Sequence, residues 1–312
     1  MVRGGGATGR ARGVPLRVRI GSRGSALALW QAEHVKTRLE ALGHAVSIEV
    51  ITTTGDRLQD RRLEAVGGKG AFLKEIEEAL LANGVDLAVH SLKDVPTALP
   101  GGLRITAVLE RADPRDAFIS NGPLLRDLPA GATVGTTSLR RQAVLRGLRP
   151  DLVVSDLRGN VDTRLSRLRE GRFDAILLAM AGLTRLGRAG EVTEALDPAV
   201  FVPAPGQGAI ALECREDDAA VAAAVRPFDH GPTASAVAAE RAFLSGLGGG
   251  CNVPLGAYAR ADHAGLQLIA FVAHPDGAGM MRGQRVGPDA MALGRGLAEE
   301  FLARGAAAIL GR

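Results

Sequence analysis

Strand-like and helix-like segments alternate along the first two thirds of this 312-residue chain, and this alternation limits the possible fold more than any other feature. Short runs of aliphatic and β-branched residues are each followed by a segment with helical spacing, which is the pattern of α/β proteins. The expected strands are 16–20, 46–52, 86–90, 104–109, 117–120, 133–135, 152–155, 174–179 and 209–213. The expected helices are 26–42, 72–81, a segment after Ser138, 161–169 and a short one that ends at Val225. The alternation predicts parallel α/β sheets.

The order of elements changes beyond the turn region Pro227–Pro232. A helix at 233–244 is followed by strands near 256–260, 266–273 and 281–285 and by a terminal helix at 290–304. Three consecutive strands between two helices predict a separate α+β domain. At the other end, residues 1–15 are rich in Gly and Arg without periodicity, and we expect a disordered extension there.

Composition excludes several classes of protein. The two cysteines, Cys214 and Cys251, are too few for a disulfide framework and fit a reducing cytoplasm. No stretch approaches the roughly 20 apolar residues that span a bilayer. The N-terminus also lacks the apolar core of a secretory signal. The histidines show no metal-ligand spacing, so we expect no metal and no membrane association.

The basic residues are strongly biased toward arginine. Of 38 basic residues only four are lysine, at positions 36, 69, 74 and 93, and the net charge is +4. The arginines are spread among acidic residues without interleaved aromatic residues, which disfavours nucleic-acid binding. Arginine forms bidentate hydrogen bonds with carboxylates and phosphates, so a small polyanion is the better candidate ligand.

Cationic and hydroxyl side chains follow the ends of five expected strands, where α/β proteins bind ligands. Together they predict a positively charged cleft. Taken singly, each arginine is better explained as a solvated residue or a local ion-pair partner, but this explanation does not suit the set as a whole. The candidate residues are Arg23, Ser25, Lys93, Ser138, Arg140, Arg141, Arg158, Arg164 and Arg185.

Asp94 is the one acidic residue among these cations. Neighbouring positive charge should keep its carboxylate ionised, so that it stabilises a cationic intermediate or accepts a hydrogen bond from a ring N–H. The alternative is a turn-forming aspartate before Val95-Pro96.

Two glycine-rich loops carry further candidates. Cys251 lies in the run Gly246–Gly256, where glycines and a proline give an accessible backbone that suits covalent attachment or nucleophilic attack. Lys69 lies in Gly67–Gly70, which lacks the spacing of a phosphate-binding loop and is better read as a lid. His90 and Cys214 are expected to be a core histidine and an inert core thiol.

Six motifs resemble the porphobilinogen deaminase family, also called hydroxymethylbilane synthase. They are Arg23-Gly-Ser-Ala-Leu-Ala with Trp30-Gln31, Val66-Gly-Gly-Lys-Gly-Ala-Phe72, His90-Ser-Leu-Lys-Asp-Val-Pro96, Gly135-Thr-Thr-Ser-Leu-Arg-Arg-Gln142, Leu157-Arg-Gly-Asn-Val-Asp-Thr-Arg-Leu165, and Glu240-Arg241 through Gly250-Cys-Asn-Val-Pro-Leu-Gly256. The resemblance runs from about Leu16 to the C-terminus. Thr137 and Pro205 depart from common family residues outside the expected site.

The resemblance implies a transferase that joins four porphobilinogen molecules head to tail into hydroxymethylbilane and releases ammonia. It implies a dipyrromethane cofactor, one per chain, linked through a thioether to Cys251. Asp94 would be the catalytic residue, and the nine cationic and hydroxyl residues would bind the carboxylates of cofactor and substrate. Lys69 and Phe72 would lie on a lid loop.

The resemblance also implies two α/β domains like those of periplasmic binding proteins and a smaller C-terminal α+β domain. We expect the first domain at 16–112 with 207–228, the second at 113–206 and the third, which carries the cofactor-attachment cysteine, at 229–312. We expect a cytoplasmic monomer. The alternatives are a non-enzymatic two-lobed binder of small polycarboxylates and a thiol transferase that uses Cys251 as nucleophile.

Overall fold

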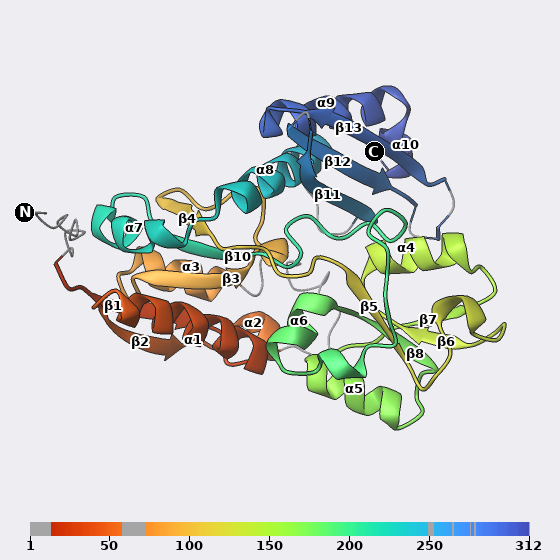
Figure 1. Cartoon of the computed structure of the whole chain (residues 1–312), viewed down its shortest axis with the longest axis horizontal. Coiled ribbons are helices and arrows are strands. Elements are labelled where there is room, and N and C mark those ends of the chain that lie inside the picture. The colour runs from red at the N-terminus through yellow and green to blue at the C-terminus, as the bar shows by residue number, and fades with distance from the viewer. Residues whose placement is uncertain are drawn as a thin grey trace, which may run out of the picture.

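The computed structural model describes residues 14–57, 73–248 and 253–311, apart from 264, 275 and 278. Its described strands form three sheets, each covered by helices (Figure 1). The expected extension, residues 1–15, lies outside the described part except for Val14 and Pro15. None of the described helices is long and apolar enough to cross a membrane.

The first sheet has the strand order β2-β1-β3-β10-β4. These strands are β2 (Ala45–Val50), β1 (Arg17–Ser22), β3 (Leu87–Ser91), β10 (Ile210–Arg215) and β4 (Leu103–Val108). Helices α1 (Ala26–Ala41) and α7 (Ala219–Val225) share one apolar cluster on one face of the sheet, and α3 (Lys74–Leu81) contributes to a separate cluster with strand residues such as Ala88.

The second sheet has the order β7-β6-β8-β5-β9. These strands are β7 (Val153–Ser155), β6 (Thr133–Gly135), β8 (Ala175–Ala179), β5 (Asp116–Ser120) and β9 (Glu194–Ala195). Helix α4 (Leu139–Leu148) packs on one apolar cluster, and α5 (Val161–Arg169) and α6 (Met180–Arg185) share another.

The prediction of parallel sheets holds only in part, because both sheets are mixed. Strand β10 runs antiparallel to β3 and β4, and β5 runs antiparallel to β8 and β9. The chain leaves the first sheet after β4, enters the second through β5, and returns to the first only as β10. Strand β10 enters the first sheet from a linker and not through the right-handed crossover of a βαβ unit. It can therefore run antiparallel to the strands beside it.

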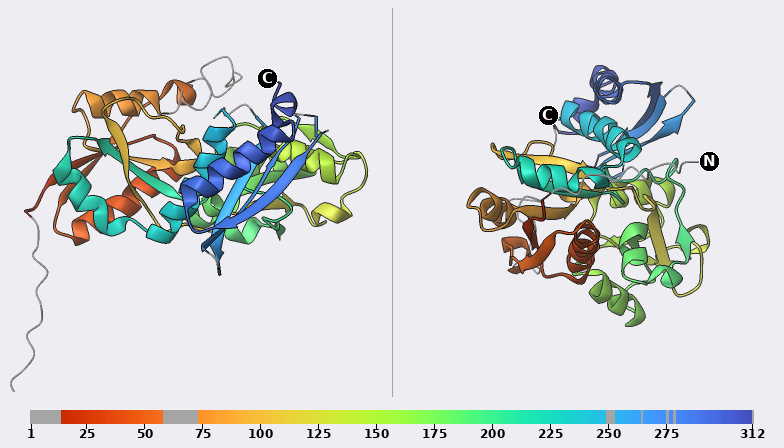
Figure 2. Two further views of the ribbon diagram at one scale, coloured as in Figure 1. Left: turned by 90° about the horizontal axis from the view of Figure 1, so that it is seen from above. Right: turned by 60° about the vertical axis from the view of Figure 1, so that its left-hand side comes forward.

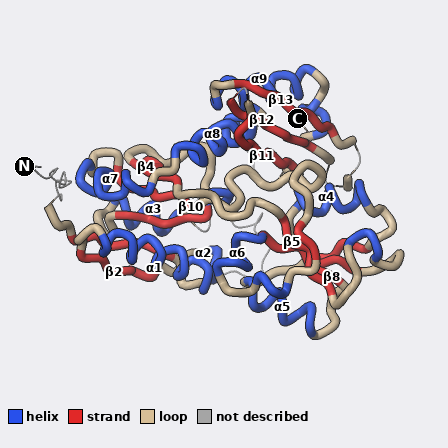
Figure 3. The backbone as a smooth tube through the Cα atoms, viewed as in Figure 1, coloured by secondary structure: helices blue, strands red, loops and turns tan. Residues whose placement is uncertain are grey.

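Two linkers therefore connect the first two sheets, at 109–115 and 196–209, and Figure 3 shows them as loop segments between the sheets. The amide of Ala112 donates to the carbonyl of Gly208 at 3.2 Å. Gly208 has φ +89°, and an added Cβ would lie 2.5 Å from the carbonyl oxygen of Ala112. The linkers cross so closely that this position requires glycine.

The third sheet contains the antiparallel strands β11 (Leu255–Asp262), β12 (Gly265–Val272) and β13 (Met281–Gly287). Helices α8 (Gly231–Gly246), α9 (Ala290–Ala303) and α10 (Ala306–Ile309) contribute to its core. Phe243 and Phe301 meet edge to face with ring centroids 5.1 Å apart. This part lies over the junction of the two α/β lobes (Figure 2).

One buried carboxylate ties this third part to both linkers. Glu240 on α8 is 0% exposed and accepts hydrogen bonds from Arg111 Nη1 at 2.6 Å and from the amide of Gly206 at 2.7 Å. The amide of Ala259 on β11 also donates to it, at 2.8 Å. A single side chain thus joins one residue of each linker to the third sheet.

The expected helices and strands that fall on described residues agree with the structure to within a few residues. The sequence analysis missed several short elements: α2 (Thr54–Arg57), β9, α6, α10 and the 3-10 turns η3 (Leu92–Asp94), η4 (Leu125–Asp127), η5 (Ala189–Glu191) and η6 (Arg226–Phe228). These elements are too short to show a hydrophobic period. The predicted fold class, two α/β lobes with a smaller α+β part, is confirmed.

Candidate active site

Asp94 ends η3, the turn that directly follows the buried strand β3. Backbone contacts hold this turn on both sides. The amide of Leu92 donates to Ala209 on the returning linker at 3.0 Å, and Arg241 Nη1 of α8 donates to the carbonyl of Val95 at 2.8 Å. Leu92 is buried, whereas Asp94 is half-buried. The backbone is therefore fixed while the carboxylate keeps access to solvent.

Asp94 interacts across the junction with Arg164 of α5. Burial and the charges of Arg141 and Arg167 lower the pKa of Arg164 to about 10, and the charge of Asp94 opposes this decrease. Arg164 Nε also donates to the carbonyl of Gly159 at 2.8 Å. The first sheet thus contributes an acidic group to a region that the second sheet makes strongly positive.

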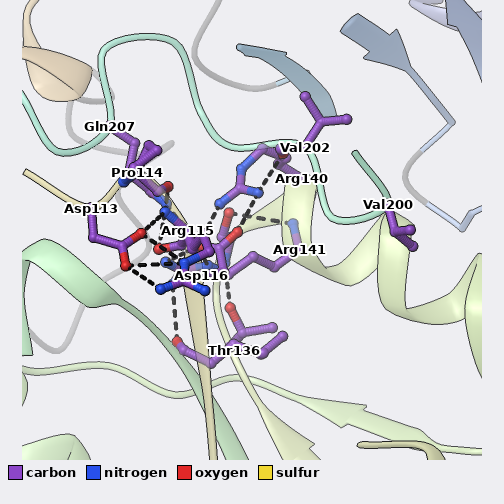
Figure 4. A network of polar contacts seen from close by, with 12 residues as sticks. Asp113, Pro114, Arg115, Asp116, Thr136, Arg140, Arg141, Val200, Val202 and Gln207 are labelled. Atoms are coloured by element: carbon purple, nitrogen blue, oxygen red, sulfur yellow. Dashed lines mark hydrogen bonds and ion pairs between the residues drawn. The ribbon is translucent and has the colours of Figure 1, made fainter. Parts of the chain in front are cut away.

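Arg140 and Arg141, on the first turn of α4, share one carboxylate, that of Asp116 (Figure 4). Asp116 is 0% exposed and each arginine is 5% exposed. Arg140 Nη1 lies 2.6 Å from Asp116 Oδ2, and Arg141 Nη2 lies 2.7 Å from Oδ1. Gln207 of the returning linker donates to the same carboxylate at 3.0 Å.

The Asp116 network carries an excess of positive charge. Burial alone would raise the pKa of Asp116, but the two guanidinium groups hold it well below its usual range. Burial lowers the pKa of Arg141, the charge of Asp116 opposes this decrease, and the charge of Arg140 adds to it. Two guanidinium groups and one carboxylate leave a net positive charge in this network. A buried net positive charge favours the binding of an anion.

Both arginines also bond to backbone carbonyls. Arg140 Nη1 donates to Val202 at 2.8 Å, and Arg141 Nη1 donates to Leu177 at 2.9 Å. The pair is therefore built into the second lobe rather than extended into solvent, as solvated helix-start residues would be.

Arg23, at the end of β1, pairs with Asp56 of α2, with Nε 3.1 Å from Oδ1. Burial would raise the pKa of Asp56, but hydrogen bonds from Arg23 and Thr53 keep it below its usual value. The sequence analysis missed Asp56, because α2 is a single turn. The only local indication of Asp56 in the sequence is its position three residues after Thr53, a spacing at which an acidic side chain can bond to the nearby backbone.

Both candidate serines are helix N-caps. Ser25 Oγ accepts a hydrogen bond from the amide of Ala28 at 3.3 Å, and Ser138 Oγ accepts one from the amide of Arg141 at 3.5 Å. A serine that accepts from the backbone still has its hydroxyl proton to donate. Each serine therefore combines a free O–H donor with the positive end of a helix.

Arg185 follows β8, as the sequence analysis expected, and is the last residue of the short helix α6. Its Nη2 donates to Gly208 at 2.7 Å, and its guanidinium lies 5.8 Å from the ring centroid of Trp30 on α1. Burial lowers the pKa of Arg185 to about 10. Arg185 thus touches the first lobe and a linker from the second lobe.

The remaining candidates are distributed as follows. Lys93 lies on η3 beside Asp94, and both are half-buried. Arg158 Nη2 lies 3.6 Å from Asp156, and Arg167 donates to the carbonyl of Arg158 at 3.1 Å. Cys251, Lys69 and Phe72 lie outside the described residues. Cys214 is 0% exposed and burial raises its pKa, as expected of an inert core thiol.

Within the described ranges, no group of three or more His, Cys, Asp or Glu residues is placed to hold a metal ion. The site instead joins one carboxylate, Asp94, to arginines of the facing lobe.

Comparison with known families agrees with this arrangement. Residues 18–223 match the family model "Porphobilinogen deaminase, dipyromethane cofactor binding domain", and residues 234–303 match "Porphobilinogen deaminase, C-terminal domain". The chain belongs to the porphobilinogen deaminase family. It is 50% identical to the porphobilinogen deaminase of Chromobacterium violaceum over 295 residues, which cover 93% of this chain and 96% of that protein. Membership confirms the enzyme class and the dipyrromethane cofactor that the motifs implied.

Solved structures of other families are only distantly similar. A periplasmic substrate-binding protein of an ABC transporter from Coxiella burnetii aligns with a TM-score of 0.43 and 14% identity, over 72% of this chain and 96% of that one. The periplasmic VFT2 domain of BvgS from Bordetella pertussis aligns with a TM-score of 0.40 and 14% identity, over 67% of this chain and 85% of that one.

Proposed function

We propose that this chain joins four porphobilinogen molecules head to tail into hydroxymethylbilane, with release of ammonia, and that Asp94 is its catalytic residue. One observation carries the proposal: in a member of this family, Asp94 opposes an arginine-rich surface of the facing lobe and acts on the pKa of Arg164. Hydroxymethylbilane is a precursor of porphyrins, so the enzyme belongs to tetrapyrrole biosynthesis.

The positive surplus fits the dipyrromethane cofactor, whose pyrroles carry acetate and propionate groups. Two buried guanidinium groups share the single carboxylate of Asp116, and burial holds the pKa of Arg164 and of Arg185 near 10. Added carboxylates would offset this charge through charge-assisted hydrogen bonds. When bound, the cofactor supplies the pyrrole to which the first porphobilinogen unit is joined.

Asp94 would stabilise the positive charge that develops on porphobilinogen as ammonia leaves. The backbone bonds of Leu92 and Val95 hold the turn that carries this carboxylate in place. A fixed charge aimed at a developing charge costs little reorganisation during the reaction. The same oxygens are suited to accept hydrogen bonds from pyrrole N–H groups.

The other candidate residues divide by their surroundings. Ser25 and Ser138 would donate their hydroxyl protons to ligand carboxylates at two helix N-termini. Arg140 and Arg141 share Asp116 and each donate to a backbone carbonyl, and with Arg164 and Arg185 they would supply positive charge to ligand carboxylates. The remaining candidates for carboxylate binding are Arg23, Lys93 and Arg158. Cys251 would anchor the cofactor, and Lys69 and Phe72 would lie on a lid loop.

The test combines mass and chemistry. Protein purified from cells that make porphobilinogen should be heavier than its sequence by one dipyrromethane unit, and it should release ammonia from porphobilinogen. A protein with the bare sequence mass and no ammonia release would refute the proposal. Ligand binding without ammonia release would instead support the alternative of a non-enzymatic polycarboxylate binder.

The proposed location is the cytoplasm and the proposed state is a monomer. The low cysteine content supports the first, because it suits a reducing compartment. The monomer follows from the resemblance, and light scattering of the purified holoenzyme tests it directly.

A further inference from the structure

Three ionisable residues outside the proposed site meet between α3 and the first sheet. Glu77 comes from α3, His90 from β3 and Glu213 from β10. His90 is 6% exposed and Glu213 is 0% exposed, and His90 Nε2 lies 2.9 Å from Glu213 Oε2. Charged groups are this deeply buried only when other groups compensate them.

The two carboxyl groups of this cluster each have a buried oxygen without a hydrogen-bond partner, Glu77 Oε1 and Glu213 Oε1. Burial and the charge of Glu213 raise the pKa of Glu77, and His90 opposes the increase less strongly. Two buried carboxylates beside one imidazole repel each other. A proton on Glu77 removes that repulsion and turns one of its oxygens into a donor.

Other charged groups near this cluster, among the residues that the structure describes, have partners elsewhere. Arg215 pairs with Asp218 at 2.7 Å and donates to the carbonyls of Leu80 and Val85. Arg19 of β1 pairs with Asp86 at 2.7 Å.

Along α3, Glu75 is bound by Thr54 and Lys74 pairs with Glu78, while Ile76 and Leu80 are apolar. From β4, the facing residues Leu103 and Ile105 are apolar as well. Arg23, at the end of β1, is paired with Asp56. Among the described residues, the charges that act on Glu77 are therefore those of Glu213 and His90.

The cluster lies next to the Asp94 turn, at the end of β3. His90 and Ser91 are the last residues of β3, and η3 begins with the next residue. Register pairs His90 with Ala211 and Ser91 with Ile210, so the His90–Glu213 bond links the two strands whose adjoining backbone holds η3. On the other side, Ser91 Oγ accepts a hydrogen bond from Gln31 of α1 at 2.9 Å.

We propose that Glu77, His90 and Glu213 form a proton-sharing cluster in which Glu77 is a neutral carboxylic acid, and that the cluster positions the Asp94 turn. The three are positioning residues, because they act through the backbone of β3 and not on the substrate. Only the second half of the proposal rests on the proposed role of Asp94.

The raised pKa of Glu77 makes the folding stability of the protein depend on pH in a defined direction. In the unfolded chain Glu77 has an ordinary pKa, and in the folded protein its pKa is raised. As pH increases between these two values, the unfolded chain releases the proton first, so folding stability decreases through that window. A glutamine at this position has no proton to release, so Glu77→Gln should abolish that decrease.

Infrared spectroscopy tests the first half without any assay of activity. At a pH between the ordinary and the raised pKa of Glu77, the wild type should show the carbonyl band of a protonated carboxylic acid, and Glu77→Gln should lose it. Glu78→Gln is the matched control, because Glu78 is exposed on the same helix and pairs only with Lys74. A wild-type spectrum without such a band, or a band that survives Glu77→Gln, would overturn the protonation.

Kinetics of the holoenzyme test the second half. Glu213→Ala should lower kcat by about tenfold to a hundredfold with little change in KM, as expected when a catalytic group is displaced by about 1 Å. Glu213→Gln, which keeps an acceptor for His90, should restore most of the rate. Equal losses in both variants, or a loss confined to KM, would refute the positioning role. A wild type that releases no ammonia would refute the proposed function while the infrared band still tested the cluster.

Discussion

Asp94 and Arg164 belong to different lobes, yet the charge of Asp94 acts on the pKa of Arg164. Asp94 lies on the turn that follows β3, and Arg164 donates a hydrogen bond to the carbonyl of Gly159. The turn of the proposed catalytic carboxylate is held by the returning linker and by α8, while a charge of the second lobe faces the carboxylate.

Asp94→Asn should lower the rate of ammonia release by about a hundredfold or more, because it removes the fixed negative charge while preserving shape. Substrate binding should persist, because the arginines are untouched. The measurement is single-turnover ammonia release together with the mass of enzyme–substrate complexes. A variant that retains near-normal turnover would remove Asp94 from its role.

Cys251→Ala should yield protein without the dipyrromethane mass, because no sulfur remains at the proposed attachment point. Cys214→Ala is the matched control, since Cys214 is buried in the core of the first lobe. Intact mass spectrometry of both variants decides the assignment. A cofactor mass that persists in Cys251→Ala and disappears in Cys214→Ala would reverse it.

Asp116→Asn should destabilise the protein by about 3–5 kcal/mol, because it leaves two buried guanidinium groups without a counter-charge. Asp113→Asn offers a matched control three residues earlier in the chain, where the pair with Arg115 is partly exposed. That change should cost less than about 1 kcal/mol. Urea unfolding measures both, and equal losses would contradict the proposed importance of the buried network.

Arg185→Gln should change the fluorescence of Trp30, the single tryptophan of the chain, because the guanidinium lies over its ring. Arg188→Gln is the control, since Arg188 forms exposed pairs with Asp162 and Glu191. The emission maximum and iodide quenching report the change. Identical spectra for wild type and Arg185→Gln would show that the contact between the lobes is not formed in solution.

Gly294→Ala should destabilise the third domain by about 1–3 kcal/mol, because the added Cβ would overlap the backbone of Ala239 on α8. Gly190→Ala places its Cβ where no other atom lies within 4 Å and should change stability by less than about 0.5 kcal/mol. Thermal unfolding compares the two. Similar stability of the two variants would mean that α8 and α9 separate easily.

The sequence predicted the fold class and the position of Asp94, because strand ends and charge patterns are local properties. It did not predict the direction of β10, which depends on where the returning linker enters the sheet. The domain boundaries and the roles of the site residues remain predictions that mutagenesis must test.

The buried partners were also missed, and their signal was weak. Asp116, Glu213 and Glu240 are each a single acid within or beside an apolar run. Such a residue predicts a buried counter-charge but not its identity, because the partner lies far along the chain. Arg140 and Arg111 supply the counter-charges of Asp116 and Glu240, and His90 supplies the hydrogen-bond partner of Glu213, only after the fold is complete.

Glu240 attaches the third domain to the linkers between the two lobes rather than to either lobe. Its carboxylate holds Arg111 of one linker and Gly206 of the other, so β11 is fastened where the two lobes are joined. If the lobes rotate about these linkers, the third domain stays near the pivot and travels little with either lobe. A chain growing from a tether on that domain would then have a stationary origin, and the walls of the cleft would move around it.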